Sequence, residues 1–68
     1  MNDDVIRQFI KDTIEAAREA RDMPDGEFKD GKLLAYNEVL SMLKTDLTPI
    51  DPEKYGLGFD IDKFIFNQ

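Results

Sequence analysis

The chain has 68 residues, enough for one small domain that buries only about 60% of the surface its unfolded form exposes. It contains neither cysteine nor histidine, which excludes disulfides and the usual zinc ligands as sources of stability and favours association with a second subunit. Its net charge of −6, from nine basic and fifteen acidic residues, argues against direct binding to nucleic acid or to an anionic membrane surface.

The first predicted element is a helix over residues 3–22. Its apolar residues recur at about 100° per residue and share one side, whereas the charged residues share the other. Asn2 or Asp3 is expected to cap the start of this helix, and Pro24 makes continuation past Met23 unfavourable. The apolar side consists of Val5, Ile6, Phe9, Ile10, Thr13, Ile14, Ala16, Ala17 and Ala20.

A second helix is predicted over residues 31–47, after a turn at Pro24, Asp25 and Gly26. Asp30 is expected to cap it. Two apolar stripes lie side by side on this helix and widen its apolar arc to about 180°. The first stripe is Leu33, Tyr36, Leu40, Leu43 and Leu47, and the second is Ala35, Val39 and Met42. A narrow helical seam needs only the first stripe, so the second one predicts a further packing partner.

The C-terminal segment, residues 48–68, has a different pattern. At residues 51–56 an Asp-Pro-Glu-Lys-Tyr-Gly run predicts one short helical turn, with a capping Asp, Pro in the first position and Gly just past the end. After this turn, alternation of apolar with small or polar residues favours an extended segment, whereas Asp62 could instead cap a last short helix. The large apolar side chains of the segment predict that it docks on the helices.

The width of both apolar arcs predicts the fold class and the assembly. We expect an all-α protein: a two-helix antiparallel hairpin with a short docked C-terminal segment, forming one domain that dimerises into a four-helix bundle. The expected centre of the core is Ile6, Phe9, Ile10, Ile14, Tyr36, Val39, Leu40 and Leu43. The residues expected at the interface are Ile6, Phe9, Ile10, Ile14, Ala35, Tyr36, Val39, Met42, Leu43, Phe59 and Phe64.

No set of side chains in the sequence predicts a reaction, a metal or a cofactor. The acidic loop around Gly26 does not fit a calcium loop, because two ligand positions would fall on Arg21 and Met23. Asp60 and Asp62 could together hold a divalent ion, but no phosphate-binding residues accompany them, and strand-face polarity or a cap explains them better. We therefore expect no cofactor, no metal and no catalytic residue, and a protein that is not an enzyme.

The second predicted helix is entered through a Phe and then a Gly, followed by an Ala-Tyr-x-Glu-Val-Leu core. The residues concerned are Phe28, Gly31, Leu33, Ala35, Tyr36, Glu38, Val39 and Leu40. With these residues and a charged first helix, the middle third of the chain resembles a set of small uncharacterised proteins of Gram-positive bacteria and their phages or mobile elements. The resemblance implies a bacterial or phage origin and a helix pair as the common unit, and it implies no activity.

The expected function is that of a non-enzymatic accessory factor that binds another protein, because surplus apolar surface accompanies the lack of chemistry. The alternative is an acidic mimic of nucleic acid that inhibits a DNA- or RNA-binding protein. The residues that favour the alternative are Asp46, Asp51, Glu53, Asp60 and Asp62. A cytoplasmic location is expected, since the chain starts with acidic residues rather than a signal peptide and no apolar run approaches the roughly 18 residues of a membrane span.

Overall fold

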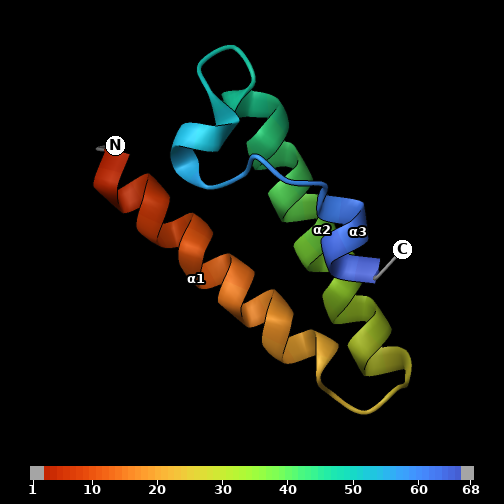
Figure 1. Ribbon diagram of the computed structural model, residues 1–68. Coiled ribbons are helices and arrows are strands. Elements are labelled where there is room, and N and C mark those ends of the chain that lie inside the picture. The colour runs from red at the N-terminus through yellow and green to blue at the C-terminus, as the bar shows by residue number, and fades with distance from the viewer. Residues whose placement is uncertain (1–2, 67–68) are drawn as a thin grey trace.

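The computed structural model describes residues 3–66 and contains helices only (Figure 1). The elements in chain order are α1 (Asp3–Arg21), α2 (Glu27–Leu47), the short 3₁₀ helix η1 (Pro52–Tyr55) and α3 (Ile61–Phe66). Helices α1 and α2 run antiparallel and diverge from the turn that joins them, with η1 lying between their far ends and α3 beside α2 (Figure 1). The prediction of an all-α hairpin with a docked C-terminal segment is confirmed.

Helix α1 matches its predicted range to within one residue at its end. The last turn closes with backbone bonds from Asp22 and Met23 to the carbonyls of the preceding turn, just before Pro24. Asn2, one of the two expected caps, lies outside the described residues. Asp3, the other, is the first helical residue, and its carboxylate accepts a hydrogen bond from Tyr55 of η1, 52 residues away.

Helix α2 begins at Glu27, four residues before the predicted start. Gly26 is the cap, and its carbonyl accepts the first helical hydrogen bond from the Asp30 amide at 3.0 Å. The prediction that Asp30 caps the helix is therefore wrong. Glu27 and Asp30 both lie in the first turn, where carboxylates complement the positive end of the helix dipole, and Gly31 in the helix interior costs only about 1 kcal/mol.

The predicted short turn after α2 is confirmed as η1. The carboxylate of Asp51 accepts the Glu53 amide at 3.1 Å, and Pro52 occupies the first helical position. Gly56 ends the element with φ 89°, in the left-handed region that favours glycine. The sequence therefore specifies both ends of η1 locally.

The last segment forms a short helix, α3, which decides between the two predicted alternatives. Its cap is Asp60: the Lys63 amide donates to the Asp60 carboxylate at 3.1 Å, and the Phe64 amide donates to the Asp60 carbonyl. The proposed cap, Asp62, is instead inside α3 and accepts a hydrogen bond from Asn37 of α2 at 2.8 Å. This contact ties α3 to α2.

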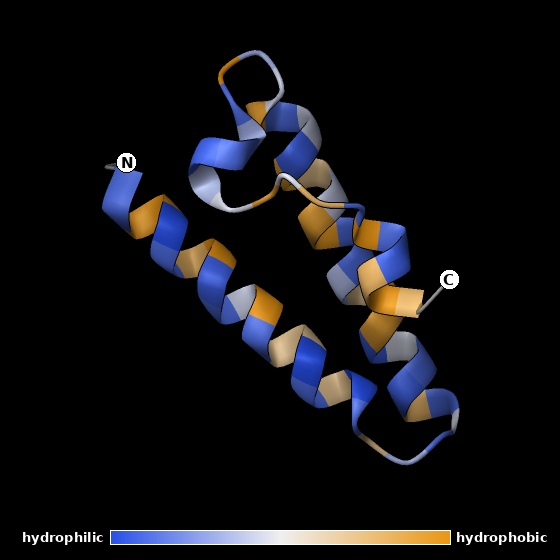
Figure 2. Ribbon diagram, in the orientation of Figure 1, coloured by the Kyte–Doolittle hydropathy of each residue, from blue (hydrophilic) through white to orange (hydrophobic). Residues whose placement is uncertain are grey.

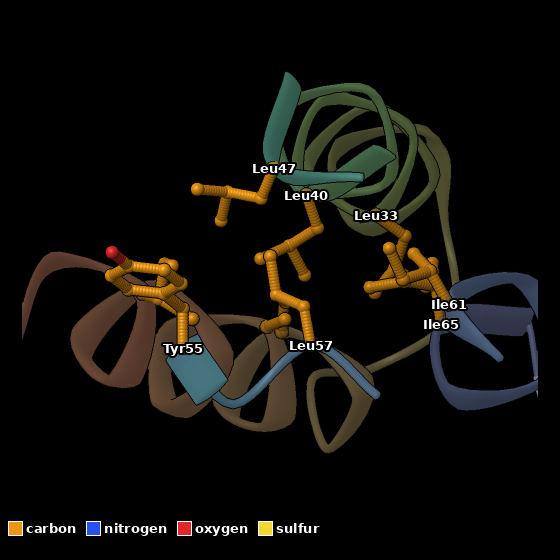
Figure 3. Close-up of a cluster of buried hydrophobic side chains, with 10 residues drawn as sticks. Leu33, Leu40, Leu47, Tyr55, Leu57, Ile61 and Ile65 are labelled. Carbon is orange, nitrogen blue, oxygen red and sulfur yellow. The ribbon is translucent and has the colours of Figure 1, made fainter. Parts of the chain in front are cut away.

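The core lies between α1, α2 and the C-terminal segment. Leu33, Leu40 and Leu47 recur every seven residues along α2 and point toward the side chains that η1 and α3 contribute (Figure 3). Figure 2 shows the hydrophobic positions of α1 along the side that faces α2. The buried hydrophobic residues are Ile10, Ala17, Ala20, Leu33, Leu40, Leu47, Tyr55, Leu57, Ile61 and Ile65. Four of these ten belong to the C-terminal segment, so the segment is an integral part of the fold. Of the residues expected at the centre of the core, Ile10 and Leu40 are fully buried, whereas the placement of Phe9 there is wrong, because its side chain is 52% exposed.

The molecule is a flat plate, with extents of 36 × 21 × 13 Å along its principal axes. Its radius of gyration, 12.2 Å, exceeds the roughly 11 Å expected for a globular domain of this length. A flat shape leaves two broad faces, and the C-terminal segment covers only one of them.

Candidate functional site

One broad face of the plate is apolar and uncovered. We call it the open face. Val5, Ile6 and Phe9 of α1 meet Leu43 of α2 on this face. At 100° per residue, the same side of each helix also carries the other members of the open face: Ala16, Phe28, Ala35, Val39 and Met42. Four large side chains on it are more than half exposed: Val5 at 51%, Phe9 at 52%, Met42 at 61% and Phe28 at 68%. Scattered apolar residues are ordinary on protein surfaces, but a contiguous set on one face marks an interaction site.

The position of the C-terminal segment explains why this face is open. On α2 the segment contacts Asn37, which donates to Asp62, and Lys44, whose ammonium donates to the Phe59 carbonyl at 2.6 Å. At 100° per residue, these two positions lie on the opposite side of α2 from Ala35 and Met42. The segment thus docks along the first apolar stripe of α2, and the second stripe has no covering element within residues 3–66.

The open face contains a cleft at the end where α1 and α2 diverge. Val5, Ile6 and Phe9 of α1 line one side of it, and Leu43 and Leu47 of α2 line the other. The cleft has a volume of about 370 Å³ and presents only apolar surface. Asp46 also borders the cleft, and no hydrogen bond or ion pair engages its carboxylate within the described residues. A cleft with this lining is suited to an apolar group.

The eleven residues expected at the interface fall into three groups. Phe9, Ala35 and Met42 are exposed on the open face, and Val39 is half-buried there. Ile6, Ile14, Tyr36, Leu43, Phe59 and Phe64 are partly buried against the core of the same chain. Ile10, at 1% exposure, has no surface left for a partner. The interface prediction therefore depends on the residues of the first group. Contacts within a single chain do not test it.

The two aromatic residues of that set in the C-terminal segment pack within the chain. The rings of Phe59 and Phe64 meet edge to face, with centroids 5.5 Å apart. The guanidinium groups of Arg18 and Arg21 lie 5.8 and 5.6 Å from the Phe64 ring centroid. These contacts attach α3 to α1 on the face opposite the open one.

Phe28 is a site residue that the sequence prediction missed. The helix predicted over residues 31–47 does not include Phe28. In the structure it lies in the first turn of α2, with the Lys32 ammonium 5.3 Å from its ring centroid. The signal that could have placed it is its spacing of seven residues from Ala35, which continues the second stripe toward the start of the helix.

The acidic residues of the C-terminal third have mostly local structural roles. Asp51 caps η1, Asp60 caps α3, and Asp62 accepts from Asn37. Across residues 3–66, no three carboxylates gather closely enough to form a metal site. Helix capping and a contact between helices thus explain three of the acidic residues that favour a nucleic-acid mimic.

A polar cluster attaches η1 to the start of α1. The Tyr55 hydroxyl donates to the Asp3 carboxylate at 2.9 Å, the Lys54 ammonium lies 3.5 Å from the same carboxylate, and the Arg7 guanidinium donates to the Lys54 carbonyl. The Tyr55 hydrogen bond, assisted by Lys54 and Arg7, lowers the pKa of Asp3 against the opposing effect of burial. The same hydrogen bond and burial raise the pKa of the Tyr55 phenol.

This cluster predicts a defined pH dependence. A lowered Asp3 pKa contributes stability above about pH 4 that is lost as the pH falls through the folded-state value, and a raised Tyr55 pKa contributes stability that is lost above about pH 10. In an NMR titration of the Asp3 carboxyl carbon, Tyr55→Phe is expected to move the midpoint to higher pH. Tyr36→Phe should leave it unchanged. Equal Asp3 midpoints in wild type and Tyr55→Phe would contradict the assignment.

Comparison with protein families, curated proteins and solved structures finds no match to the chain. None of the helices in residues 3–66 combines the length and apolarity needed to cross a bilayer. The open face and the cleft within it are therefore the features that indicate a function.

Proposed function

We propose that this protein is a non-enzymatic accessory factor of the cytoplasm that acts through protein–protein contact, and that its first partner is a second copy of itself. The observation that supports this is the open face, where Phe9, Phe28 and Met42 are each more than half exposed. The proposal that it is not an enzyme rests on the sequence, which lacks the usual catalytic base, histidine.

The dimensions of the plate support self-association. With extents of 36 and 21 Å along its two longer axes, the molecule has a broad side large enough for an interface of standard size, roughly 800 Å² per partner. Two plates stacked through their open faces would place four long helices in two layers, the expected four-helix bundle. The two C-terminal segments would then lie on the outside of the dimer, where they are available to another protein.

A charged substitution in the middle of the open face tests this proposal. Met42→Glu is expected to convert the dimer to a monomer in sedimentation velocity while leaving the helical circular dichroism unchanged, because an unpaired carboxylate would be buried at the interface. Leu34→Glu is the matched control: Leu34 is on the same helix and 54% exposed, but about 80° further around it. Equal dissociation by both variants, or by neither, would contradict the proposal.

The salt dependence of binding distinguishes this function from the alternative, an acidic mimic of nucleic acid. Association through an apolar face is expected to persist from 0.1 to 1 M NaCl, roughly the range over which the screening length falls from about 10 to 3 Å. Binding of a basic partner by an acidic mimic would weaken strongly over the same range. A partner isolated with this protein that releases at high salt would therefore favour the alternative.

A further inference from the structure

The open face has complementary features at its two ends. At one end Phe28 projects from the first turn of α2, 68% exposed, and at the other the apolar cleft opens between α1 and the last turns of α2. Phe28 and Asp46, which borders the cleft, are 18 residues apart. This is five helical turns, so they lie on one line along α2, separated by about 27 Å. At this separation Phe28 cannot reach the cleft of its own molecule.

We propose, on the basis of the function proposed above, that two copies dock antiparallel about a twofold axis so that Phe28 of each enters the cleft of the other. A twofold axis across the middle of α2 brings position 28 of one protomer opposite position 46 of its partner. The insertion then occurs twice by symmetry, and the interface closes as a dimer. Each cleft is completed by a residue from the other copy.

The cleft fits this occupant. Its volume of about 370 Å³ is sufficient for a phenyl ring, since an apolar cavity of about 150 Å³ holds benzene. Val5, Ile6, Phe9, Leu43 and Leu47 supply apolar contacts around it. Aromatic side chains buried in well-packed pockets of a partner commonly supply much of the binding energy of an interface.

Charge complementarity supports the same arrangement. The Lys32 ammonium lies beside the Phe28 ring, 5.3 Å from its centroid, and Asp46 borders the cleft that would receive this ring. Neither Lys32 nor Asp46 has an ion-pair partner within the described residues. Antiparallel docking brings each Lys32 close to Asp46 of the other copy. Parallel docking would instead place like charges together, which is unfavourable.

The small side chain near the proposed axis is consistent with close approach. Ala35 is on the line between Phe28 and Asp46, and Val39 is one turn further along. Short side chains at the crossing point allow the two α2 helices to approach while the large residues fill the ends. The second apolar stripe thus becomes the contact line between the two α2 helices.

Phe28→Ala tests the anchor. Removal of two buried rings per dimer is expected to raise the dimer dissociation constant by at least about tenfold. The helical circular dichroism should not change, because Phe28 makes little contact with its own core. Leu34→Ala, which removes a similarly exposed apolar side chain from another side of α2, should leave the constant within about twofold of wild type.

Charge reversal tests the antiparallel orientation at low salt. Lys32→Asp and Asp46→Lys are each expected to weaken the dimer by about threefold to tenfold, since two pairs per dimer become repulsive. The double variant should recover the wild-type constant. Residues 32 and 46 are about 21 Å apart along one helix, so recovery cannot arise within a chain.

The outcomes separate this inference from the function on which it rests. The docking mode would be overturned if Phe28→Ala left the dimer dissociation constant unchanged, or if the double charge reversal did not restore it. Self-association through the open face would still stand in that case. A wild-type chain that stays monomeric would overturn both. Weakening by Phe28→Ala together with compensation by the double charge reversal would establish the docking mode.

Discussion

Leu40→Ala is expected to lower the free energy of unfolding by about 2–5 kcal/mol. Leu40 is fully buried at the middle of α2, between the first and last of the three heptad-spaced leucines. Its side chain meets Leu57 and its neighbours where α1, α2 and the C-terminal segment converge (Figure 3). Truncation removes these contacts and leaves a cavity, and a domain of this size has little stability to lose.

Thermal and urea denaturation followed by circular dichroism measures this effect. The variant is expected to be largely unfolded at 25 °C or to melt far below wild type. Leu34→Ala, on the same helix but 54% exposed, is the control and should change the unfolding free energy by no more than about 0.5 kcal/mol. If Leu40→Ala melts cooperatively within a few degrees of wild type, Leu40 is not at the centre of the core.

Removal of residues 49–68 is expected to abolish the folded state. The deletion takes away Tyr55, Leu57, Ile61 and Ile65, four of the ten buried hydrophobic residues, and exposes the leucines of the first stripe to water. The remaining pair of helices would then be apolar on two sides, and no element of the chain would be left to cover the first stripe. Loss of the cooperative melt, with aggregation on concentration, is the expected result.

A full-length chain with Ile50→Ser is the control for this deletion. Ile50 lies between α2 and η1 and is 65% exposed, so its replacement should leave the melt intact. A chain ending at Thr48 that retains a cooperative melt would show that the helix pair folds without the segment. In that case the four buried residues of the segment would be dispensable for the core.

Local signals in the sequence were sufficient for several elements. The 3.6-residue periodicity specifies α1, and the Asp-Pro start and glycine end specify η1, because each depends on neighbours in the chain. The start of α2 was misplaced since Asp30 and Gly31 mimic a helix entry, whereas the chain turns helical directly after Gly26. For the last segment, the helical alternative has Asp62 as its cap, whereas the cap in the structure is Asp60, on the other side of Ile61.

The contacts between elements could not be predicted from the sequence pattern. The width of the apolar arc on α2 predicted that something beyond α1 packs there, but both stripes are apolar, so the pattern does not say which one the C-terminal segment covers. The contacts of Asn37 and Lys44 with that segment decide it. The cleft likewise depends on the divergence of α1 and α2, which no local pattern encodes. These long-range contacts and the divergence of α1 and α2 therefore decide which face stays open.

The mass of the wild-type chain in solution tests the central claim most directly. Size exclusion with light scattering, over protein concentrations from micromolar to millimolar, is expected to give a dimer of about 15.8 kDa, twice the chain mass of 7.9 kDa, in both low and high salt. A mass that remains at 7.9 kDa at the highest concentration would contradict the claim, because the open face would then be exposed to water in the isolated protein.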